Sequence, residues 1–337
     1  YENIVATTED SHVPYKICSF DIEASSSHGD FPLPVKSYKK LANEILEFSQ
    51  RKVLTNEDFI YIIKLAFGYE KNQSYNISKV YIKTSIDEEK LLNKTRKILE
   101  INLNDVSSGT KNRTMTIEQL ISKQNQDYDS DEEYNSFIRC NNDELKKIVN
   151  IIDLLQNNEI VREIKAEKLN YVLTTYLPEI KGDMVTFIGS TFMNYGNDTI
   201  YKNHCLVLND CCELPNVSNS DVVCCKTEKE LLIKWAQLIK EEDPDMIIGY
   251  NIFGFDYEFM FRRACEIGCV VEFLKTSRNN EEICGLKDKD GNYRIQQTNI
   301  VLASGQHDLS YINMPGRIQI DLYNYFRRDF NLESYKL

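Results

Sequence analysis

Several features that would mark large classes of protein are missing from this sequence. No apolar run approaches the roughly 20 residues that a membrane span requires, and no signal peptide is present, so we expect neither a membrane protein nor a secreted one. Acidic residues (52) outnumber Lys and Arg (40), and the net charge of −12 argues against a general nucleic-acid binder. It does not exclude a nuclease whose contacts are local and whose acidic site is neutralised by metal ions.

The ten cysteines also lack a spacing that would define their use. They include the adjacent pairs Cys211-Cys212 and Cys224-Cys225, but no Cys-x-x-Cys motif of the kind that holds structural zinc. Zinc binding by the adjacent pairs is an alternative, but reduced thiols in a cytosolic or nuclear protein are expected. Because the first residue is Tyr1 rather than Met, we expect the chain to be part of a longer protein.

An acidic segment near the N-terminus is the pattern around which the rest is organised. Residues 15–24 are rich in apolar, β-branched and aromatic side chains, which predicts a β-strand. Because side chains alternate along a strand, Asp21 and Glu23 should share one face, with Phe20 on the other. Two carboxylates about 7 Å apart can bind one divalent cation, and one of them could bridge a second. An edge strand with its acidic face in water is the alternative that this spacing leaves open.

Helical periodicity dominates the next part of the chain, and strand patterns return near Gly182. A capping box at Thr55–Asp58 precedes one of the helices, which are expected over 38–48, 59–66, 87–103, 143–155 and 159–170. The acidic run within 123–136 is expected to be a solvated, mobile loop rather than a metal site. The predicted parts are the approach and first strand (1–34), a helical insertion (35–181) and the remainder of the strand-rich domain (182–337).

The strand-rich part reads as a mixed α/β layer domain, interrupted by the helical insertion. Strands are expected over 184–189, 204–208, 246–249 and 317–321, with a hairpin turn at Asp290-Gly291. A capping box at Thr227–Glu230 begins a helix, and Gly268 is placed to end another. The short continuous apolar run 246–249 is typical of a strand covered on both faces.

A further acidic residue, Asp256, follows that apolar run at the start of a predicted helix. Its simplest role is an N-terminal cap, worth about 1 kcal/mol. The carboxyl end of a strand is also where α/β sheets place ligands, and Asn251 and Phe255 accompany Asp256 there. Asn can bond a sugar or phosphate oxygen, and a ring can stack on a base for about 1–3 kcal/mol. A turn former and a core residue are the respective alternatives for these two side chains.

Three segments, taken in order, resemble the exonuclease motifs of family B DNA polymerases. Ser19–Glu23 (Ser-Phe-Asp-Ile-Glu) resembles the first motif, and Asp243–Asp256 resembles the segment that holds the second. Gly316–Asp321, followed by Leu332–Leu337, resembles the segment that precedes the third. The resemblance is strongest to the δ-like polymerases of large DNA viruses, including giant viruses of protists and algae. It covers roughly 15–34 and 182–337.

This resemblance implies a 3′→5′ proofreading exonuclease with a ribonuclease H-like fold, in which helices flank a mixed central sheet. By resemblance, Asp21 bridges two Mg²⁺ or Mn²⁺ ions, Glu23 binds one of them, and Asp256 supports the second. The family positions that hold the frayed 3′ end of the primer correspond to Phe20, Asn251 and Phe255. Mispaired ends melt more readily than paired ones, which supplies part of the selectivity.

The chain departs from the family pattern in its length and in its insertion. The third motif, Tyr-x-x-x-Asp, is expected downstream of Leu337, so the fragment alone should be weakly active or inactive. Tyr325 and Asp329 have the same spacing, but the family has an ordinary helix at that position. The segment 284–305 occupies the place of a hairpin that helps separate primer from template in relatives. The insertion is expected to be a surface elaboration with its own core, a docking site for a replication partner being the alternative.

The sequence therefore predicts a fragment of a DNA-directed DNA polymerase that contains most of its proofreading exonuclease. A catalytically silent exonuclease-like scaffold or DNA-binding module is the alternative, and a stand-alone nuclease is disfavoured by the Tyr1 start and the missing third motif. Expected partners are a DNA primer-template with its single-stranded 3′ end, the rest of the polymerase chain, and a sliding clamp or other replication factors, with no membrane. The expected place of action is intracellular, in the host nucleus or a cytoplasmic viral factory.

Overall fold

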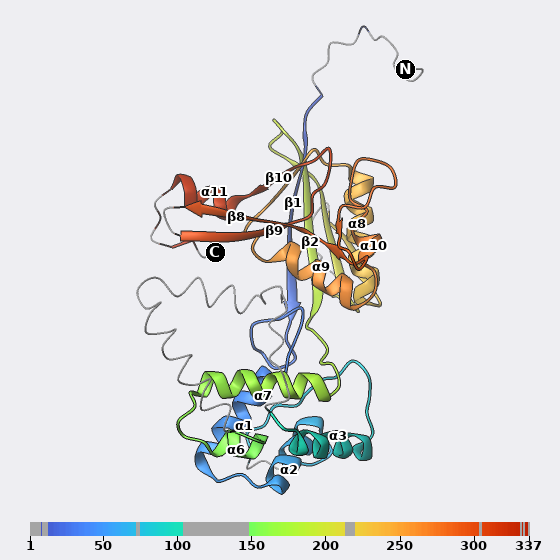
Figure 1. The fold of residues 1–337 in the computed structure, drawn as a ribbon. Coiled ribbons are helices and arrows are strands. Elements are labelled where there is room, and N and C mark those ends of the chain that lie inside the picture. Colours follow the sequence, from blue (N-terminus) through green and yellow to red (C-terminus); the bar gives the residue numbers. More distant parts are fainter. Residues whose placement is uncertain are drawn as a thin grey trace. The chain divides into compact units, whose positions relative to one another are not determined.

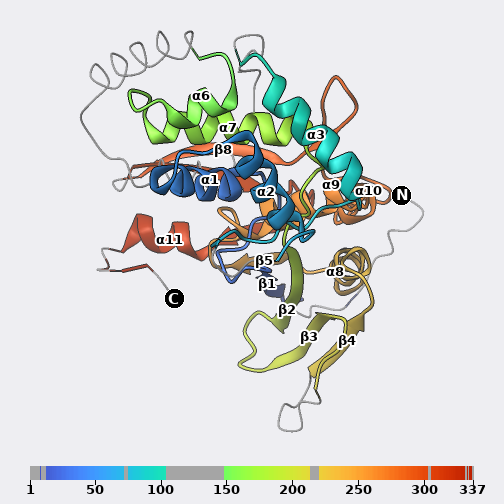
Figure 2. The ribbon, with the colours of Figure 1, turned by 90° about the horizontal axis from the view of Figure 1, so that it is seen from below.

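The chain divides into two compact units in the computed structural model (Figures 1 and 2). The sheet unit comprises Tyr1–Pro34 and Asp183–Leu337, and the insertion unit comprises Val35–Gly182. The polypeptide therefore leaves the sheet unit after its first strand and re-enters it before the second.

The structure describes residues 8, 13–71, 75–103, 148–212, 220–302, 305–330, 332, 334 and 335. The polar, acidic segment 123–136 and the first residues of the helix predicted over 143–155 lie outside the described residues.

A six-stranded mixed sheet organises the sheet unit. Its spatial order is β10-β5-β1-β2-β3-β4, and its strands are β1 (Lys16–Ser25), β2 (Met184–Asn194), β3 (Ile200–Leu208), β4 (Ser220–Cys225), β5 (Met246–Gly249) and β10 (Ile318–Asp321). The pairs β1–β2 and β2–β3 are antiparallel, whereas β1–β5, β5–β10 and β3–β4 are parallel. The sheet confirms the predicted α/β class, but β4 had not been expected as a strand.

Helices α8 (Glu228–Glu242), α9 (Asp256–Glu266) and α10 (Val270–Phe273) cover one face of this sheet. The apolar side chains of β1 pack against them, and the Phe20 ring lies 5.0 Å from that of Trp235. Helix α11 (Leu322–Asp329) lies on the other side of the sheet from α8 (Figures 1 and 2). Burial of large rings such as Trp235 contributes about 1.5–3 kcal/mol each, so this face is the core of the unit.

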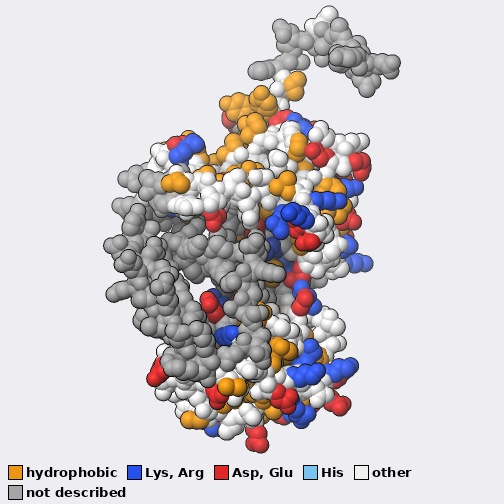
Figure 3. Space-filling model, in the orientation of Figure 1, with side chains coloured by type: hydrophobic (Ala, Val, Ile, Leu, Met, Phe, Trp, Pro, Cys, Tyr) orange, Lys and Arg blue, Asp and Glu red, His pale blue; other side chains and the backbone are white. Residues whose placement is uncertain are grey.

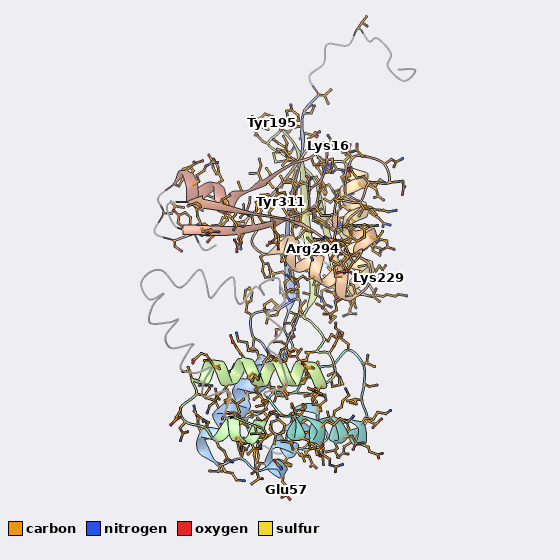
Figure 4. The ribbon with its side chains drawn as sticks, viewed as in Figure 1. Lys16, Glu57, Tyr195, Lys229, Arg294 and Tyr311 are labelled. Carbon is orange, nitrogen blue, oxygen red and sulfur yellow. The ribbon has the colours of Figure 1, made fainter. Side chains whose placement is uncertain are left out.

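Two hairpins precede β10. The first joins β6 (Leu286–Lys287) to β7 (Tyr293–Arg294), and Gly291 has the positive φ of 83° that the predicted Asp-Gly turn requires. The second joins β8 (Gln296–Leu302) to β9 (Gly305–Tyr311), and the sequence reading did not foresee it as a separate element. At its end, the ring of Tyr311 packs 5.4 Å from Phe253 in the sheet unit (Figure 4).

The described part of the insertion unit is helical, with a core of its own. Its helices are α1 (Lys39–Arg51), α2 (Asn56–Phe67), α3 (Glu88–Glu100), α6 (Ile151–Gln156) and α7 (Arg162–Tyr176). The predicted capping box is present at the start of α2, where the Thr55 side chain accepts from the Asp58 N–H and the Asp58 carboxylate accepts from the Thr55 N–H.

In each unit, hydrogen bonds join the two chain segments next to the points where the polypeptide passes between the units. In the sheet unit, Leu33 donates its N–H to the Asp183 carboxylate at 2.9 Å, and the Asp183 N–H donates to the Leu33 carbonyl at 2.8 Å. In the insertion unit, the Tyr38 hydroxyl donates to the Pro178 carbonyl at 2.6 Å. At the opposite end of β1 and β2, Lys16 lies near Tyr195 (Figure 4).

A buried ion cluster joins the helices that cover the sheet. Arg263 of α9 is fully buried and donates to Glu228 of α8 at 2.7 Å, pairs with Glu266 at 2.8 Å, and donates to the Pro34 carbonyl at 3.1 Å. Glu228 also accepts from the Val185 N–H at the start of β2. Glu228 is on α8, Arg263 and Glu266 are on α9, and Pro34 and Val185 lie on either side of the insertion. The cluster therefore fixes these segments of the sheet unit relative to one another.

Candidate active site

Asp21 and Glu23 lie on the solvent-exposed face of β1, as the alternation predicted. Their apolar neighbours Cys18, Phe20 and Ile22 are buried on the opposite face. Strand β1 is not an edge strand, because it pairs with β2 on one side and with β5 on the other. The pairing with β5 covers Ile17–Ser19 and ends before Asp21, so at the two carboxylates the described pairing of β1 is with β2, and the acidic face is exposed.

The structure places the Phe20 side chain in the core of the sheet unit. The side chain is only 3% exposed and packs between Trp235 and Tyr257, at ring distances of 5.0 and 5.4 Å. Because it points away from Asp21, the ring cannot contact a DNA end held at the acidic face. The period-2 pattern of the strand places Phe20 in the core, and this outweighs the role transferred by resemblance.

The turn after β5 carries the next site residues. Gly249 ends the strand where a β-carbon would lie 2.2 Å from the Ile252 side chain. Asn251 then adopts a left-handed conformation, with φ of 61°, and its carbonyl accepts from the N–H groups of Gly254 and Phe255. A β-carbon on Gly254 would lie 2.3 Å from the Asn251 amide oxygen. The turn therefore requires both glycines and a residue that tolerates the left-handed region.

Asp256, the first residue of α9, points across to β1 rather than capping its own helix. The N-cap residue is Phe255, and no side chain caps the helix, so the capping alternative is wrong. The Asp256 side chain is 2% exposed, and its Oδ1 accepts from the Ile22 N–H at 3.2 Å. The Asp21 carboxylate lies within hydrogen-bond reach of it. Residues far apart in the sequence thus meet at one point of the sheet.

The Asp21 and Asp256 carboxylates repel each other when both are negatively charged. Burial, followed by the charge of Asp21, raises the pKa of Asp256 to about 8. The hydrogen bond from the Ile22 N–H acts in the opposite direction. A carboxylate that is buried beside another carboxylate binds either a proton or a cation. The pair is therefore a place where a divalent cation with a preference for oxygen ligands would be stabilised.

Glu23 does not complete a ready metal-binding group. Among the residues that the structure describes, no three Asp, Glu, His or Cys side chains converge to hold a metal ion. Asp21 and Asp256 thus come together, while Glu23 shares the exposed face of β1 with Asp21. The same finding gives no support to zinc binding by the cysteines. Asp329, which together with Tyr325 has the spacing of the third motif, pairs with its neighbour Arg328 at 2.8 Å at the end of α11.

Phe255, the residue before Asp256, belongs to an aromatic pair. The half-buried ring of Phe255 meets the exposed ring of Phe31, which is in the loop after β1, edge to face at 5.6 Å. Phe255 also packs against Phe259 of α9, so it is anchored on one side and open on the other. The sequence reading missed Phe31, although an exposed aromatic side chain close behind Glu23 was the signal available.

The surface of the sheet unit carries both signs of charge in the view of Figure 3. Over the described part of the sheet unit that Figure 3 presents, Lys and Arg side chains are interspersed with Asp and Glu. In that view, a nucleic acid would meet local contacts rather than a broad basic surface, in keeping with the net charge of −12. None of the helices in the described ranges is long and apolar enough to cross a membrane.

Comparison with known proteins identifies the class to which this fold and site belong. Residues 163–337 match the model of the family described as DNA polymerase family B, exonuclease domain. The chain therefore belongs to this family, which confirms the resemblance drawn from the motifs and the predicted fold class.

The relatives include viral and cellular proteins. The DNA polymerase of Phaeocystis pouchetii virus is 39% identical over 100% of this chain and 34% of its own length, and that of Pyramimonas orientalis virus is 30% identical over 100% and 26%. The DNA polymerase delta catalytic subunit of Arabidopsis thaliana is 32% identical over 48% of this chain and 14% of its own length. The chain thus spans about a third or less of the curated relatives it matches.

Proposed function

We propose that the sheet unit is a 3′→5′ exonuclease that removes nucleotides from the 3′ end of DNA, and that it proofreads for a DNA-directed DNA polymerase of which this chain is a part. The observation that carries the proposal is the meeting of buried Asp256 with Asp21 at the acidic face of β1. Membership of the exonuclease-domain family supports the reaction class, and the viral DNA polymerases that align over the whole chain support the larger context.

Mg²⁺ or Mn²⁺ fits the carboxylate pair. Both ions prefer carboxylate oxygens, and a cation between Asp21 and Asp256 would relieve the repulsion that raises the pKa of Asp256. We propose that Asp21, Glu23 and Asp256 hold two such ions. When bound, a pair of divalent ions activates the attacking water and stabilises the leaving oxygen of a phosphodiester.

The chain's own side chains would bind and orient the DNA end. The rings of Phe255 and Phe31 are available for stacking on a terminal base, at about 1–3 kcal/mol per base, and Asn251 is available for a sugar or phosphate oxygen. Because a mispaired 3′ end melts more readily than a paired one, a site that accepts only the single strand selects mismatched ends. Phe20 has no part in this proposal, because its ring is in the core.

The test is 3′ trimming of a labelled mismatched primer by the complete polymerase that contains this domain, with Mg²⁺ or Mn²⁺. The variant Asp21→Ala plus Glu23→Ala should lower the trimming rate by about 1,000-fold. Its unfolding temperature should be unchanged or slightly higher, because the variant removes the Asp21 charge that repels Asp256. A matched control, Asp221→Ala plus Glu272→Ala, removes two exposed carboxylates elsewhere in the sheet unit and should trim normally. Normal trimming by the Asp21/Glu23 variant would refute the catalytic assignment.

A catalytically silent scaffold or DNA-binding module is the second candidate. It is favoured by one observation, the lack of a converged group of three metal-binding side chains among the described residues. The same assay separates the two functions. A silent domain would bind single-stranded DNA with no metal-dependent trimming, and the Asp21/Glu23 variant would then behave like the unaltered protein.

The wider partners follow from the proposed reaction. We propose that the domain receives the 3′ end of a primer-template from the rest of the polymerase chain, that a sliding clamp or other replication factors assist it, and that it works inside the host cell, in the nucleus or a cytoplasmic viral factory. The similarity of the chain to viral DNA polymerases supports this setting.

A further inference from the structure

Asp321 is buried at the place where three segments of the sheet unit meet. It is the last residue of β10, it pairs in parallel register with Gly249 at the end of β5, and its side chain is 4% exposed. A buried carboxylate without partners would be strongly destabilising, so its hydrogen bonds reveal what it stabilises.

The Asp321 carboxylate accepts hydrogen bonds from two different segments. Within its own, Oδ1 accepts from the Tyr323 N–H at 2.9 Å, which caps α11, and Oδ2 accepts from the Asn324 amide at 3.0 Å. Across the sheet, Oδ1 accepts from the Asn251 N–H at 2.8 Å and Oδ2 accepts from the Phe253 N–H at 3.0 Å. Each oxygen thus serves one local and one distant donor.

The two distant donors belong to the turn that carries the site. Asn251 holds a left-handed conformation, which Asn tolerates better than most residues, and the bond from its N–H to Asp321 helps to hold it there. The Asn251 carbonyl then accepts from the Phe255 N–H at 2.9 Å, one residue before Asp256. A chain of hydrogen bonds therefore runs from Asp321 through the turn to the start of α9.

We infer that Asp321 is a positioning residue for the exonuclease site, setting the turn that presents Asn251 and Phe255 to the DNA end. This inference rests on the proposed exonuclease function. Asp321 itself is not a metal ligand, because all four of its hydrogen bonds are made to N–H groups. Asp256 has a separate anchor in the Ile22 N–H, so Asp321 acts on DNA positioning more directly than on the carboxylate pair.

Substitution by Ser separates this role from the capping of α11. Ser is a good N-cap residue, so Asp321→Ser can retain the bond to Tyr323, but its short side chain cannot serve the Asn251 and Phe253 N–H groups together. Asp321→Asn keeps the shape but places an amide N–H₂ where an acceptor is needed. Asp329→Ser, at the exposed far end of α11, is the matched control.

The experiment measures trimming of single-stranded DNA by the complete polymerase. Asp321→Ser should lower kcat/KM by about 10- to 100-fold, chiefly through a higher KM, while the Mg²⁺ concentration for half-maximal activity stays near that of the unaltered enzyme. Adding Asn251→Ala should cause little further loss, because Asp321→Ser already displaces the turn that presents the Asn251 side chain, which the second change removes. If Asp321→Ser proves unfolded by thermal scan, Asp321→Asn provides the same comparison.

Two results would overturn the inference. One is normal kinetics for Asp321→Ser in a folded protein, which would reduce Asp321 to a helix cap. The other is a fully multiplicative loss with Asn251→Ala, which would mean that the two residues act independently. Failure of the proposed function is distinguishable, because the Asp21→Ala plus Glu23→Ala variant would then trim normally in the same assay.

Discussion

The sheet unit buries carboxylates and guanidinium groups, whereas the described buried residues of the insertion unit are apolar except for Thr95 and Lys165. The buried charged residues of the sheet unit are Asp183, Glu228, Asp256, Glu258, Arg263, Arg317 and Asp321. Because burial of charge is unfavourable unless partners compensate it, such groups mark places where geometry or chemistry is specified. The comparison assigns the chemistry to the sheet unit and an ordinary helical core to the insertion.

The relatives differ in how much of this chain they align with. The two viral DNA polymerases align over 100% of this chain, insertion included, whereas the delta catalytic subunits align over 48%. The insertion is therefore shared with viral relatives while carrying none of the residues proposed for hydrolysis.

The largest effect on stability is expected from breaking the buried ion cluster of the sheet unit. Arg263→Met removes the buried guanidinium that pairs with Glu228 and Glu266, and should reduce the free energy of unfolding by about 3–5 kcal/mol. Urea denaturation measures the loss. Arg328→Met, which removes an exposed ion pair on α11, should change it by less than about 1 kcal/mol. Equal losses in the two variants would show that the buried ion cluster stabilises the sheet unit no more than an exposed ion pair does.

A cavity in the insertion should destabilise that unit without affecting catalysis. Leu169 of α7 is fully buried in the insertion core, and Leu169→Ala should cost about 2–5 kcal/mol. Hydrogen exchange of the insertion amides should locate the loss there, while 3′ trimming is maintained. Glu167→Ala, an exposed neighbour on the same helix, should lie within about 0.5 kcal/mol of the unaltered protein. Reduced trimming by a folded Leu169→Ala protein would contradict the division of labour.

A smaller, pH-dependent effect is expected at Lys165, the buried cation of the insertion. Burial lowers its pKa below the ordinary 10.5, and among the described residues its ammonium donates to the Leu155 carbonyl, at 3.4 Å. Between the folded-state pKa and 10.5 the unfolded chain binds more protons, so this residue makes stability rise with pH. Lys165→Met should therefore stabilise the protein at pH 7, by under about 1 kcal/mol, with a smaller gain at pH 10. Thermal unfolding at both pH values is the measurement, and an equal gain at both would contradict it.

The smallest effect on activity is expected from removing the insertion altogether. Leu33 and Asp183 exchange two hydrogen bonds within the sheet unit, so a linker of about four residues can replace residues 35–182. Trimming should stay within about twofold of the intact polymerase. The matched control is the same linker with Asp21→Ala plus Glu23→Ala, which should be inactive. A folded but inactive linker variant would show that the insertion contributes to the site.

Much of the fold was predictable because local signals agreed with tertiary packing. The alternation in β1, the apolar run of β5 and the glycine that ends α9 all predicted the observed elements. The parallel strand β4 and the β8–β9 hairpin were missed, because polar and short apolar segments acquire strand structure only from their partners. Tertiary pairing, which local pattern does not contain, decided these segments.

The site was predictable in its carboxylates but not in its support. Asp21 and Asp256 were chosen by motif order, and they meet. Phe20 was assigned by resemblance against the evidence of its own strand pattern. Asp321 was interpreted only as part of a motif, since the two hydrogen-bond donors that link it to the turn lie some 70 residues away in the sequence. Phe31 lacked any spacing signal, because its neighbour Phe255 is distant in the chain.

The Leu33–Asp183 and Tyr38–Pro178 hydrogen bonds have a consequence for how the chain folds. Strands β1 and β2 must pair although Leu33 and Asp183 are separated by 150 positions. Loop-closure entropy grows with the logarithm of loop length, and the Tyr38–Pro178 bond closes 140 of those positions within the insertion itself. Once the insertion has folded, β1 meets β2 across a short effective loop, which lowers the entropic barrier to their pairing by about 2 kcal/mol. The insertion, which contributes none of the proposed catalytic residues, thereby favours the assembly of the sheet that carries them.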